Sequence, residues 1–163
     1  MNIIINKNFL LYKGYKLKCC VGKSGLTKSK KEGDLKTPKG LFGIGPLYYR
    51  KDRVNLTKCL IKKKIIKKNM GWCDDPKSTK YNKQIFYPFK YRSEKLYIRK
   101  KIYDILVNIK YNQLPTLKGK GSAIFLHISN KKYKPTKGCI AVKKKDLLKI
   151  LPLISTKTKI LIK

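Results

Sequence analysis

Acidic residues and histidine are scarce in this sequence. Its 163 residues include only 8 Asp and Glu and a single histidine, His127, against 42 Lys and Arg. Metal sites usually combine several His, Cys or acidic side chains at short spacings, and no Cys-x-x-Cys pair occurs. The one possible grouping, His127 with the run Cys73-Asp74-Asp75, has no recognised ligand spacing. We therefore expect no metal ion and no other cofactor.

Long apolar runs are also missing. No stretch is long enough to cross a bilayer as a helix. Residues 1–16 are interrupted by Lys7 and Lys13, so they lack the apolar segment of a secretory signal. The sequence therefore predicts no transmembrane segment, and no export signal is visible in it.

A complete disulfide framework is excluded by the number of cysteines. The sequence has five cysteines, an odd number, so at least one thiol is free or bonded to another molecule. A chain of this length can bury a core without such cross-links. We expect a single domain over residues 1–163. The cysteines are Cys19, Cys20, Cys59, Cys73 and Cys139.

Positive charge is abundant, with a formal net charge of +34. Such an excess attracts polyanions such as nucleic acid or an acidic polymer. The lysines nevertheless run from Lys7 to Lys163 without a single basic tail, and Ile, Asn and Tyr are abundant too. This distribution favours lysine as the default residue at solvated positions of a protein from an AT-rich genome. The densest clusters are Lys28–Lys31, Lys62–Lys68 and Lys143–Lys145.

Short apolar and β-branched runs between turn residues predict a mainly β fold with one or two short helices. A long loop at 22–40 separates the third and fourth runs. Residues 71–84 have the composition of a loop, Ser93 is a candidate cap for a helical turn at 93–98, and 59–68 fits either helix or strand. Leu147, Leu148 and Leu151 have helical spacing, which Pro152 ends. The predicted strands are at 3–12 (a hairpin), 16–21, 41–49, 102–109, 123–129, 140–142 and 156–162.

His127 and Cys139 are the residues that most strongly suggest chemistry. His127 lies near the end of one predicted strand, and Cys139 opens the next after a loop of about ten residues. An imidazole can take the proton of a thiol, which makes the sulfur a nucleophile, and can later return it to a leaving group. We expect the sulfur to face solvent, ionised by His127. The alternative is a buried structural cysteine and an unrelated histidine.

The residues before Cys139 suit such a nucleophile. Gly138 lets the backbone approach closely, so that N–H groups around Gly138 and Cys139 can stabilise an oxyanion. The hydroxyl of Thr136 is expected to orient the base or to position the substrate.

The segment "HISNKKYKPTKGCIAV", residues 127–142, resembles the catalytic signature of the L,D-transpeptidase (YkuD-like) domain family. That signature has a His, a variable loop, Ser or Thr, one residue, Gly, Cys and a strand. "KKEGDLKTPKGLFGIG" at 30–45 resembles the family's Thr-Pro-x-Gly segment. "GWCDDP", "YDILVNIKYN" and "GKGSAIFLHIS" are similar to blocks of a compact proteobacterial subgroup, so that the resemblance runs from about Val21 to Leu151.

The resemblance implies a β-sandwich fold and an enzyme that acts on peptidoglycan stem peptides in the periplasm or cell envelope. Cys139 would attack a stem-peptide amide, His127 would serve as general base and then acid, and Gly138 would belong to the oxyanion hole. The acyl group would pass to the side-chain amine of a diamino acid, forming 3-3 or 1-3 cross-links. Transfer to water would make the protein an L,D-carboxypeptidase.

Two positions depart from the better-known members of the family. Lys137 stands where they have His, and Ala141 where they often have Arg or Asn. Both departures leave the donor specificity open. We expect Lys137 to contact substrate, or to lower the pKa of Cys139 by its charge.

Further substrate contacts are predicted at Trp72, Asp74, Asp75 and Thr37. Asp74 or Asp75 would bind a substrate ammonium or orient a group of the site; the alternative is a turn in which Asp accepts from backbone N–H groups.

Two other functions compete with the enzyme. One is a basic module that binds nucleic acid without sequence preference, since no specific nucleic-acid motif occurs. The other is a non-catalytic wall-binding domain, against which the presence of both His127 and Cys139 argues.

Overall fold

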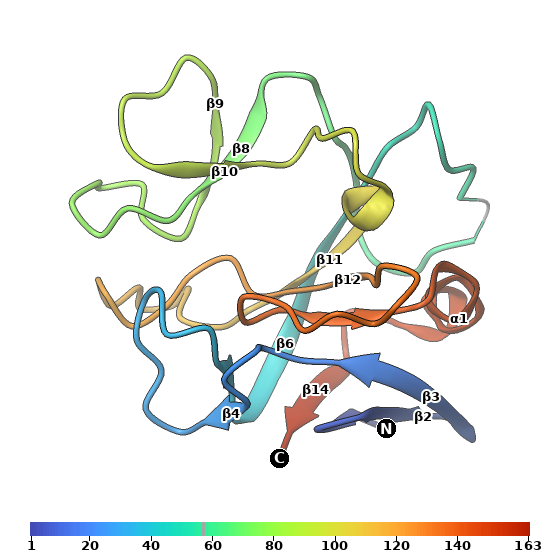
Figure 1. Ribbon diagram of the computed structural model, residues 1–163. Coiled ribbons are helices and arrows are strands. Elements are labelled where there is room, and N and C mark those ends of the chain that lie inside the picture. The colour runs from blue at the N-terminus through green and yellow to red at the C-terminus, as the bar shows by residue number, and fades with distance from the viewer. Residues whose placement is uncertain (57) are drawn as a thin grey trace.

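The main sheet is a ring of strands that closes on itself. The computed structural model describes residues 1–56 and 58–163. Nine strands follow the order β11-β12-β13-β3-β2-β1-β14-β6-β7, and β11 also pairs with β6 (Figure 1). The long strand β6 makes this closure possible, because its first half pairs with β14 and its second half with β11. The prediction of a mainly β fold with one or two short helices is confirmed.

The strands of the main sheet are short apart from β6. Their bounds are β1 (Ile3–Asn6), β2 (Phe9–Tyr12), β3 (Tyr15–Cys20), β6 (Gly40–Tyr49), β7 (Lys63–Ile65), β11 (Ile105–Ile109), β12 (Phe125–Ile128), β13 (Ile140–Val142) and β14 (Lys159–Ile162). The remaining elements are β4 (Leu26–Thr27), β5 (Thr37–Pro38), β8 (Met70–Cys73), β9 (Gln84–Phe86), β10 (Ser93–Lys95), the helix α1 (Lys144–Ile150) and 3₁₀ turns at Lys101–Tyr103 and Leu151–Leu153.

Local sequence accounts for the N-terminal hairpins. The predicted hairpin over 3–12 is formed by β1 and β2. The next turn, Lys13-Gly14, has positive φ at both residues (45° and 82°), as a two-residue hairpin turn of type I′ requires. Strand β2 alternates between exposed and buried residues because only one of its faces meets the core.

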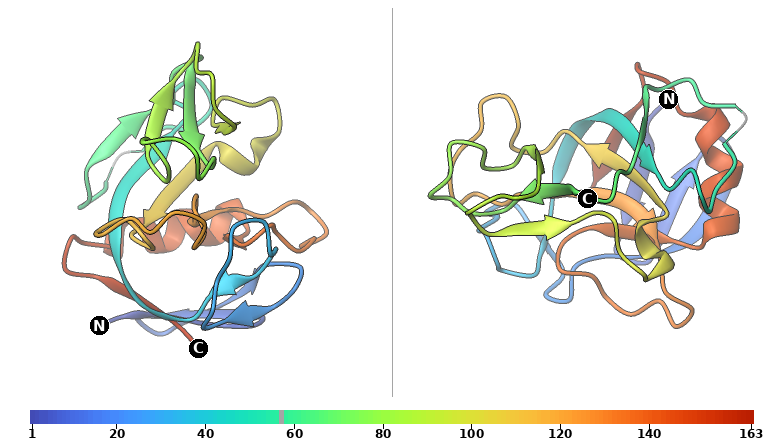
Figure 2. Two further views of the ribbon diagram at one scale, coloured as in Figure 1. Left: turned by 90° about the vertical axis from the view of Figure 1, so that its left-hand side faces the viewer. Right: turned by 90° about the horizontal axis from the view of Figure 1, so that it is seen from above.

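Strands β11, β12 and β13 are buried on both faces, because each separates two apolar cores. The larger core fills the ring and includes Leu126 and Ile140. The smaller core lies on the other face and includes Phe125, Trp72 and Cys139. A three-stranded sheet, in the order β10-β8-β9, forms a separate layer over this second face (Figures 1 and 2). His127 and Cys139 thus come from strands that lie between two layers.

One prediction in the middle of the chain is wrong, and a second is wrong in part. Residues 93–98 were predicted as a helical turn, yet Ser93 begins β10 and pairs with Cys73. Residues 71–84 were predicted as a loop, which holds for 74–83, whereas 71–73 belong to β8, the central strand of the small sheet. In both places pairing between distant strands overrides weak local propensity. The ambiguous segment 59–68 contains β7, and α1 ends before Pro152 as predicted.

No helix in the described part of the chain has the length and apolar character needed to span a membrane.

Candidate active site

His127 and Cys139 lie on neighbouring parallel strands. His127 is opposite Ala141 in the β12–β13 ladder. Two positions earlier, Cys139, which directly precedes β13, lies beside Phe125, whose backbone N–H donates to the Cys139 sulfur at 3.4 Å. Alternate residues of a strand point to the same face, so His127 and Cys139 share the face covered by the small sheet. The predicted pair is therefore brought together, although no hydrogen bond joins the two side chains in the described structure.

The Cys139 thiol is buried and protonated. It is 8% exposed, and it donates a hydrogen bond to the carbonyl oxygen of Ala123 at 3.1 Å. Burial, with a smaller effect from the charge of Glu94, raises the pKa of Cys139 to about 12. The prediction of an exposed, ionised sulfur is wrong for this conformation, because the covering layer removes the water that would stabilise a thiolate.

His127 is neutral at pH 7, and its tautomer is fixed. Burial lowers its pKa to about 4, and the carbonyl groups of Ile128 and Ile102 partly oppose this effect. Nδ1 lies 3.0 Å from the carbonyl oxygen of Ile128. A carbonyl oxygen can only accept, so in the neutral ring Nδ1 carries the proton and Nε2 holds a free lone pair. The imidazole is thus prepared to accept a proton at Nε2.

The turn before Cys139 is fixed by Thr136. The Thr136 hydroxyl donates to the carbonyl of Cys139 at 2.6 Å and accepts from the N–H of Gly138 at 3.1 Å. Both polar contacts therefore stay within the turn. The predicted role of Thr136 in orienting the base or substrate is replaced here by a role in shaping the backbone around the nucleophile.

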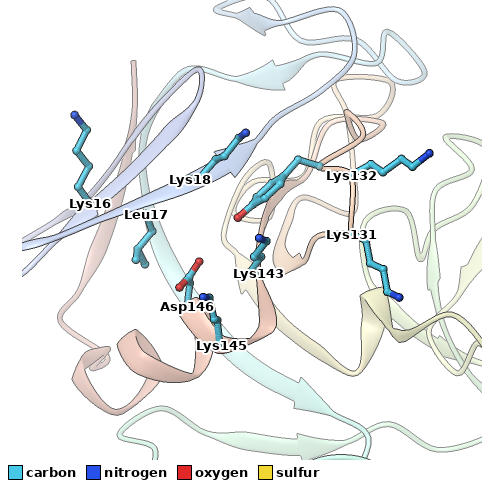
Figure 3. A pocket seen from close by; sticks show the side chains of 9 residues that line it. Lys16, Leu17, Lys18, Lys131, Lys132, Lys143, Lys145 and Asp146 are labelled. Carbon is cyan, nitrogen blue, oxygen red and sulfur yellow. The ribbon is translucent and has the colours of Figure 1, made fainter.

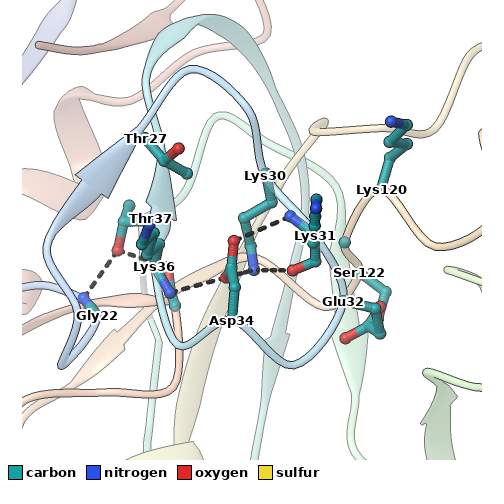
Figure 4. Close-up of polar contacts among 12 residues, drawn as sticks. Gly22, Thr27, Lys30, Lys31, Glu32, Asp34, Lys36, Thr37, Lys120 and Ser122 are labelled. Atoms are coloured by element: carbon teal, nitrogen blue, oxygen red, sulfur yellow. Dashed lines mark hydrogen bonds and ion pairs between the residues drawn. The ribbon is translucent and has the colours of Figure 1, made fainter.

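Thr37 holds the same turn from the opposite side. It is fully buried, and its hydroxyl donates to the carbonyl of Gly138 at 2.7 Å while it accepts from the N–H of Gly22 at 2.8 Å (Figure 4). A Cβ on Gly138, which has φ +143°, would lie 2.9 Å from the carbonyl oxygen of Lys36. Thr37 was predicted to bind substrate, which stays a prediction; in the described structure its hydroxyl bonds to the backbone of the Gly138–Cys139 turn.

The loop that carries Thr37 is organised by a buried ion pair. Lys30 is 6% exposed, and its ammonium group contacts Asp34 at 2.5 Å and donates to the carbonyl of Lys31 at 2.9 Å (Figure 4). Asp34 also accepts from the backbone N–H groups of Lys31 and Lys36. A Cβ built on Gly138 would lie 3.8 Å from Cε of Lys30, so this loop packs against the turn that precedes Cys139.

Trp72 packs beneath the site and contacts no open surface. Its indole N–H donates to Asn82 Oδ1 at 3.0 Å, and the same oxygen accepts from the N–H of Ala123 at 3.1 Å. The Trp72 ring meets Phe125 edge to face, with the ring centroids 5.1 Å apart. Trp72 is buried in the described conformation, and its predicted contact with substrate stays a prediction. Trp72 and Asn82 thus hold Ala123 in place, and the carbonyl of Ala123 accepts the hydrogen bond from the Cys139 thiol.

The two aspartates after Trp72 are used in different ways. Asp75 accepts from the backbone N–H groups of Lys77 (3.0 Å) and Arg92 (3.3 Å), as the turn alternative predicted. Asp74 forms an ion pair with the exposed Arg92 at 3.1 Å. Lys137 is exposed.

Tyr103 and Glu94 form a wall of the site that the sequence did not reveal. The Tyr103 ring meets His127 edge to face at 5.3 Å, and its hydroxyl donates to Glu94 Oε1 at 2.5 Å. Burial raises the pKa of Glu94. Tyr103 belongs to an apolar run and gave no signal of its own. Glu94 is one of only 8 acidic residues, and this scarcity was the one available sign.

Among residues 1–56 and 58–163, no three His, Cys, Asp or Glu side chains are grouped as metal ligands. The described structure brings a buried thiol and a neutral imidazole to one face of the sheet, beside a glycine turn. The family model of the L,D-transpeptidase catalytic domain, YkuD, matches residues 3–162. No curated protein and no solved structure matches the chain. Since the match includes both His127 and Cys139 and nearly the whole sequence, the chain belongs to the YkuD family of L,D-transpeptidase catalytic domains.

Proposed function

We propose that this protein is a peptidoglycan L,D-transpeptidase that uses Cys139 as nucleophile and His127 as general base and acid. The observation that carries this proposal is the placement of both residues on one face of adjacent parallel strands, with His127 Nδ1 bonded to Ile128. The family match supports the reaction class. We further propose that residues 1–163 act as a single catalytic domain and that the reaction takes place in the cell envelope, where its substrate is found.

The first half of the reaction forms an acyl-enzyme. The thiol proton, now donated to Ala123, moves to Nε2 of His127 as the sulfur attacks the amide carbonyl of a stem peptide. The sulfur–carbon bond forms, the carbon–nitrogen bond breaks, and the imidazolium returns its proton to the leaving amine. Because burial favours neutral forms of both groups, proton transfer accompanies the attack and does not precede it.

The oxyanion of this step needs N–H donors. The backbone N–H of Cys139 has no acceptor within residues 1–56 and 58–163, so it is available to the substrate. Thr136, Thr37 and Gly138 fix its direction. In the second half, an amine attacks the thioester, loses a proton to His127 and restores the thiol. Water in place of the amine gives a carboxylate, which is the carboxypeptidase reaction.

Lys137 and Asp74 are the proposed substrate contacts. Lys137 is exposed, and Asp74 keeps part of its carboxylate in contact with solvent. A lysine ammonium suits a stem carboxylate, and an aspartate suits the ammonium of a diamino acid. These opposite charges match a substrate that carries both groups.

Purified muropeptides test the proposal. We expect the wild-type protein to form cross-linked products, detected by mass spectrometry, and Cys139→Ala to form none while it keeps the thermal unfolding midpoint of the wild type. Cys59→Ala, a second free thiol outside the site, is the matched control and retains activity. A carbapenem should add covalently to the peptide that contains Cys139. Full cross-linking by Cys139→Ala would overturn the proposal, and hydrolysed stems without cross-links would identify a carboxypeptidase.

A further inference from the structure

A basic hollow lies outside the candidate active site. It is a shallow, open depression with a volume of about 530 Å³, bordered by β3, the loop after β12 and the start of α1. Figure 3 shows Lys18, Lys143 and Lys145 near its centre and Lys16, Lys131 and Lys132 extending at its margins. Asp146 is the one acidic residue that lines it. Six ammonium groups therefore surround a single concave surface with one carboxylate.

Tyr133 fixes the middle of this hollow. The ammonium groups of Lys18 and Lys143 lie 5.0 and 5.4 Å from the centre of its ring, within the range of cation–π attraction. The loop that carries Tyr133 is held by Asn130, whose side-chain oxygen accepts from two backbone N–H groups of the loop. The ring and the two charges next to it are thus positioned by the fold.

A second hollow, of about 590 Å³, continues the first. It shares Lys18, Lys132 and Tyr133 with it and adds Lys7 and Lys23. We call the two hollows together the basic groove. None of the residues that line it is Arg. Lysine binds phosphate as a point charge, whereas planar bidentate recognition depends on Arg. The groove is therefore expected to favour ligands with closely spaced negative charges over ligands of a particular planar shape.

We propose that the basic groove binds a flexible phosphate polymer that carries no bases. The positive charges of eight lysines repel one another in the groove, and a chain of closely spaced phosphates neutralises them. Binding also releases the counterions that the phosphate chain holds in solution, which favours the complex. Binding of single-stranded nucleic acid depends on open aromatic faces for stacking. Tyr133 is the one aromatic residue that lines the groove, and two ammonium groups already occupy its ring. The groove does not include His127 or Cys139, so this inference is independent of the proposed function.

The decisive comparison removes equal charge from two places. One variant carries Lys18→Gln, Lys143→Gln and Lys145→Gln in the groove; the control carries Lys62→Gln, Lys67→Gln and Lys68→Gln, three exposed lysines outside it. The probe is fluorescently labelled inorganic polyphosphate, followed by anisotropy at low salt. We expect the groove variant to raise the dissociation constant about tenfold or more and to reduce its salt dependence, and the control to change it by less than about twofold. Equal weakening in both variants would show that only total charge matters and would overturn the proposal.

Two further ligands identify the chemistry. Polyglutamate of matched charge should bind the full-length protein more weakly than polyphosphate, because carboxylates carry less charge per unit length. A single-stranded oligonucleotide should bind no more tightly than polyphosphate, and Tyr133→Leu should change the binding of both ligands by about the same factor. Tighter binding of the oligonucleotide that is lost in Tyr133→Leu would assign the groove to nucleic acid and reject a base-free polymer. Absence of any polyphosphate binding at low salt would reject the site altogether.

Discussion

The hydroxyl of Thr37 donates a hydrogen bond to the carbonyl of Gly138, a residue 101 positions later in the chain, at 2.7 Å. This contact joins the loop before β6 to the turn that presents Cys139. The same hydroxyl accepts from Gly22, so one small side chain satisfies two buried backbone groups. The geometry of the nucleophile therefore depends on a residue that is itself inaccessible to substrate.

Replacing Thr37 should damage both stability and acylation. Thr37→Val keeps the shape but leaves the N–H of Gly22 and the carbonyl of Gly138 without partners, which should cost about 2–3 kcal/mol of unfolding free energy. Urea denaturation measures that loss, and the rate of carbapenem addition measures the effect on Cys139. Thr37→Ser retains the hydroxyl and serves as the control. Equal stability of the Val and Ser variants would contradict the assigned role.

The glycine before the nucleophile should tolerate no side chain. Gly138→Ala places a Cβ 2.9 Å from a backbone oxygen at φ +143°, so we expect a loss of about 1–3 kcal/mol and a large decrease in acylation rate. Gly14→Ala is a suitable comparison, because Gly14 also has positive φ (82°) but nothing lies within 4 Å of the added atom. Thermal unfolding and acylation rates are measured for both variants. Gly14→Ala shows the effect of backbone strain alone, and Gly138→Ala adds the steric clash of the new Cβ with the backbone oxygen. A milder effect at Gly138 than at Gly14 would be incompatible with the described turn.

Stability should fall in acid because of His127. Its pKa is about 4 when folded and 6.5 in the unfolded chain, so between these values the unfolded state binds more protons. The free energy of unfolding therefore rises with pH across this window, and the stability present above the unfolded pKa is lost as pH falls towards 4. The full effect amounts to about 3 kcal/mol. Urea titrations at several pH values should show this slope in the wild type and a flatter profile in His127→Gln. An identical slope in both proteins would assign the acid sensitivity to other groups.

Alkylation should distinguish a neutral Cys139 from an ionised one. Iodoacetamide reacts with thiolates, and the raised pKa and burial of Cys139 predict slow modification, about tenfold slower than for the half-buried Cys59. The time course is read by mass spectrometry of the two peptides. The rate at Cys139 should increase with pH. A rate that stays constant between about pH 5 and pH 8 would instead reveal a thiolate–imidazolium pair.

The parts of the fold that followed from sequence are those with a local pattern. The hairpin of β1 and β2, the strand of His127 and the helix before Pro152 all show their period or turn residues within about ten positions. The small sheet was missed because Ser93 and Trp72 acquire their conformation from each other's strands. The burial of the Cys139 thiol was missed because the residues that cover it, such as Trp72 and Tyr103, lie far from it in the chain. Tyr103 became part of the site only through its contact with His127.

The parallel pairing of β1 with β14 sets the order of events during synthesis. Ile3 is opposite Ile160, and Ile5 is opposite Ile162, so the first strand gains its neighbour from the last. A nascent chain on the ribosome cannot close the ring until residues 159–162 have emerged, and until then the edges of β1 and β6 lack the strand that joins them. Contacts between such distant segments also slow folding. We therefore expect the ring to assemble only once residues 159–162 have left the ribosome, with its two unpaired edges exposed to self-association in the meantime.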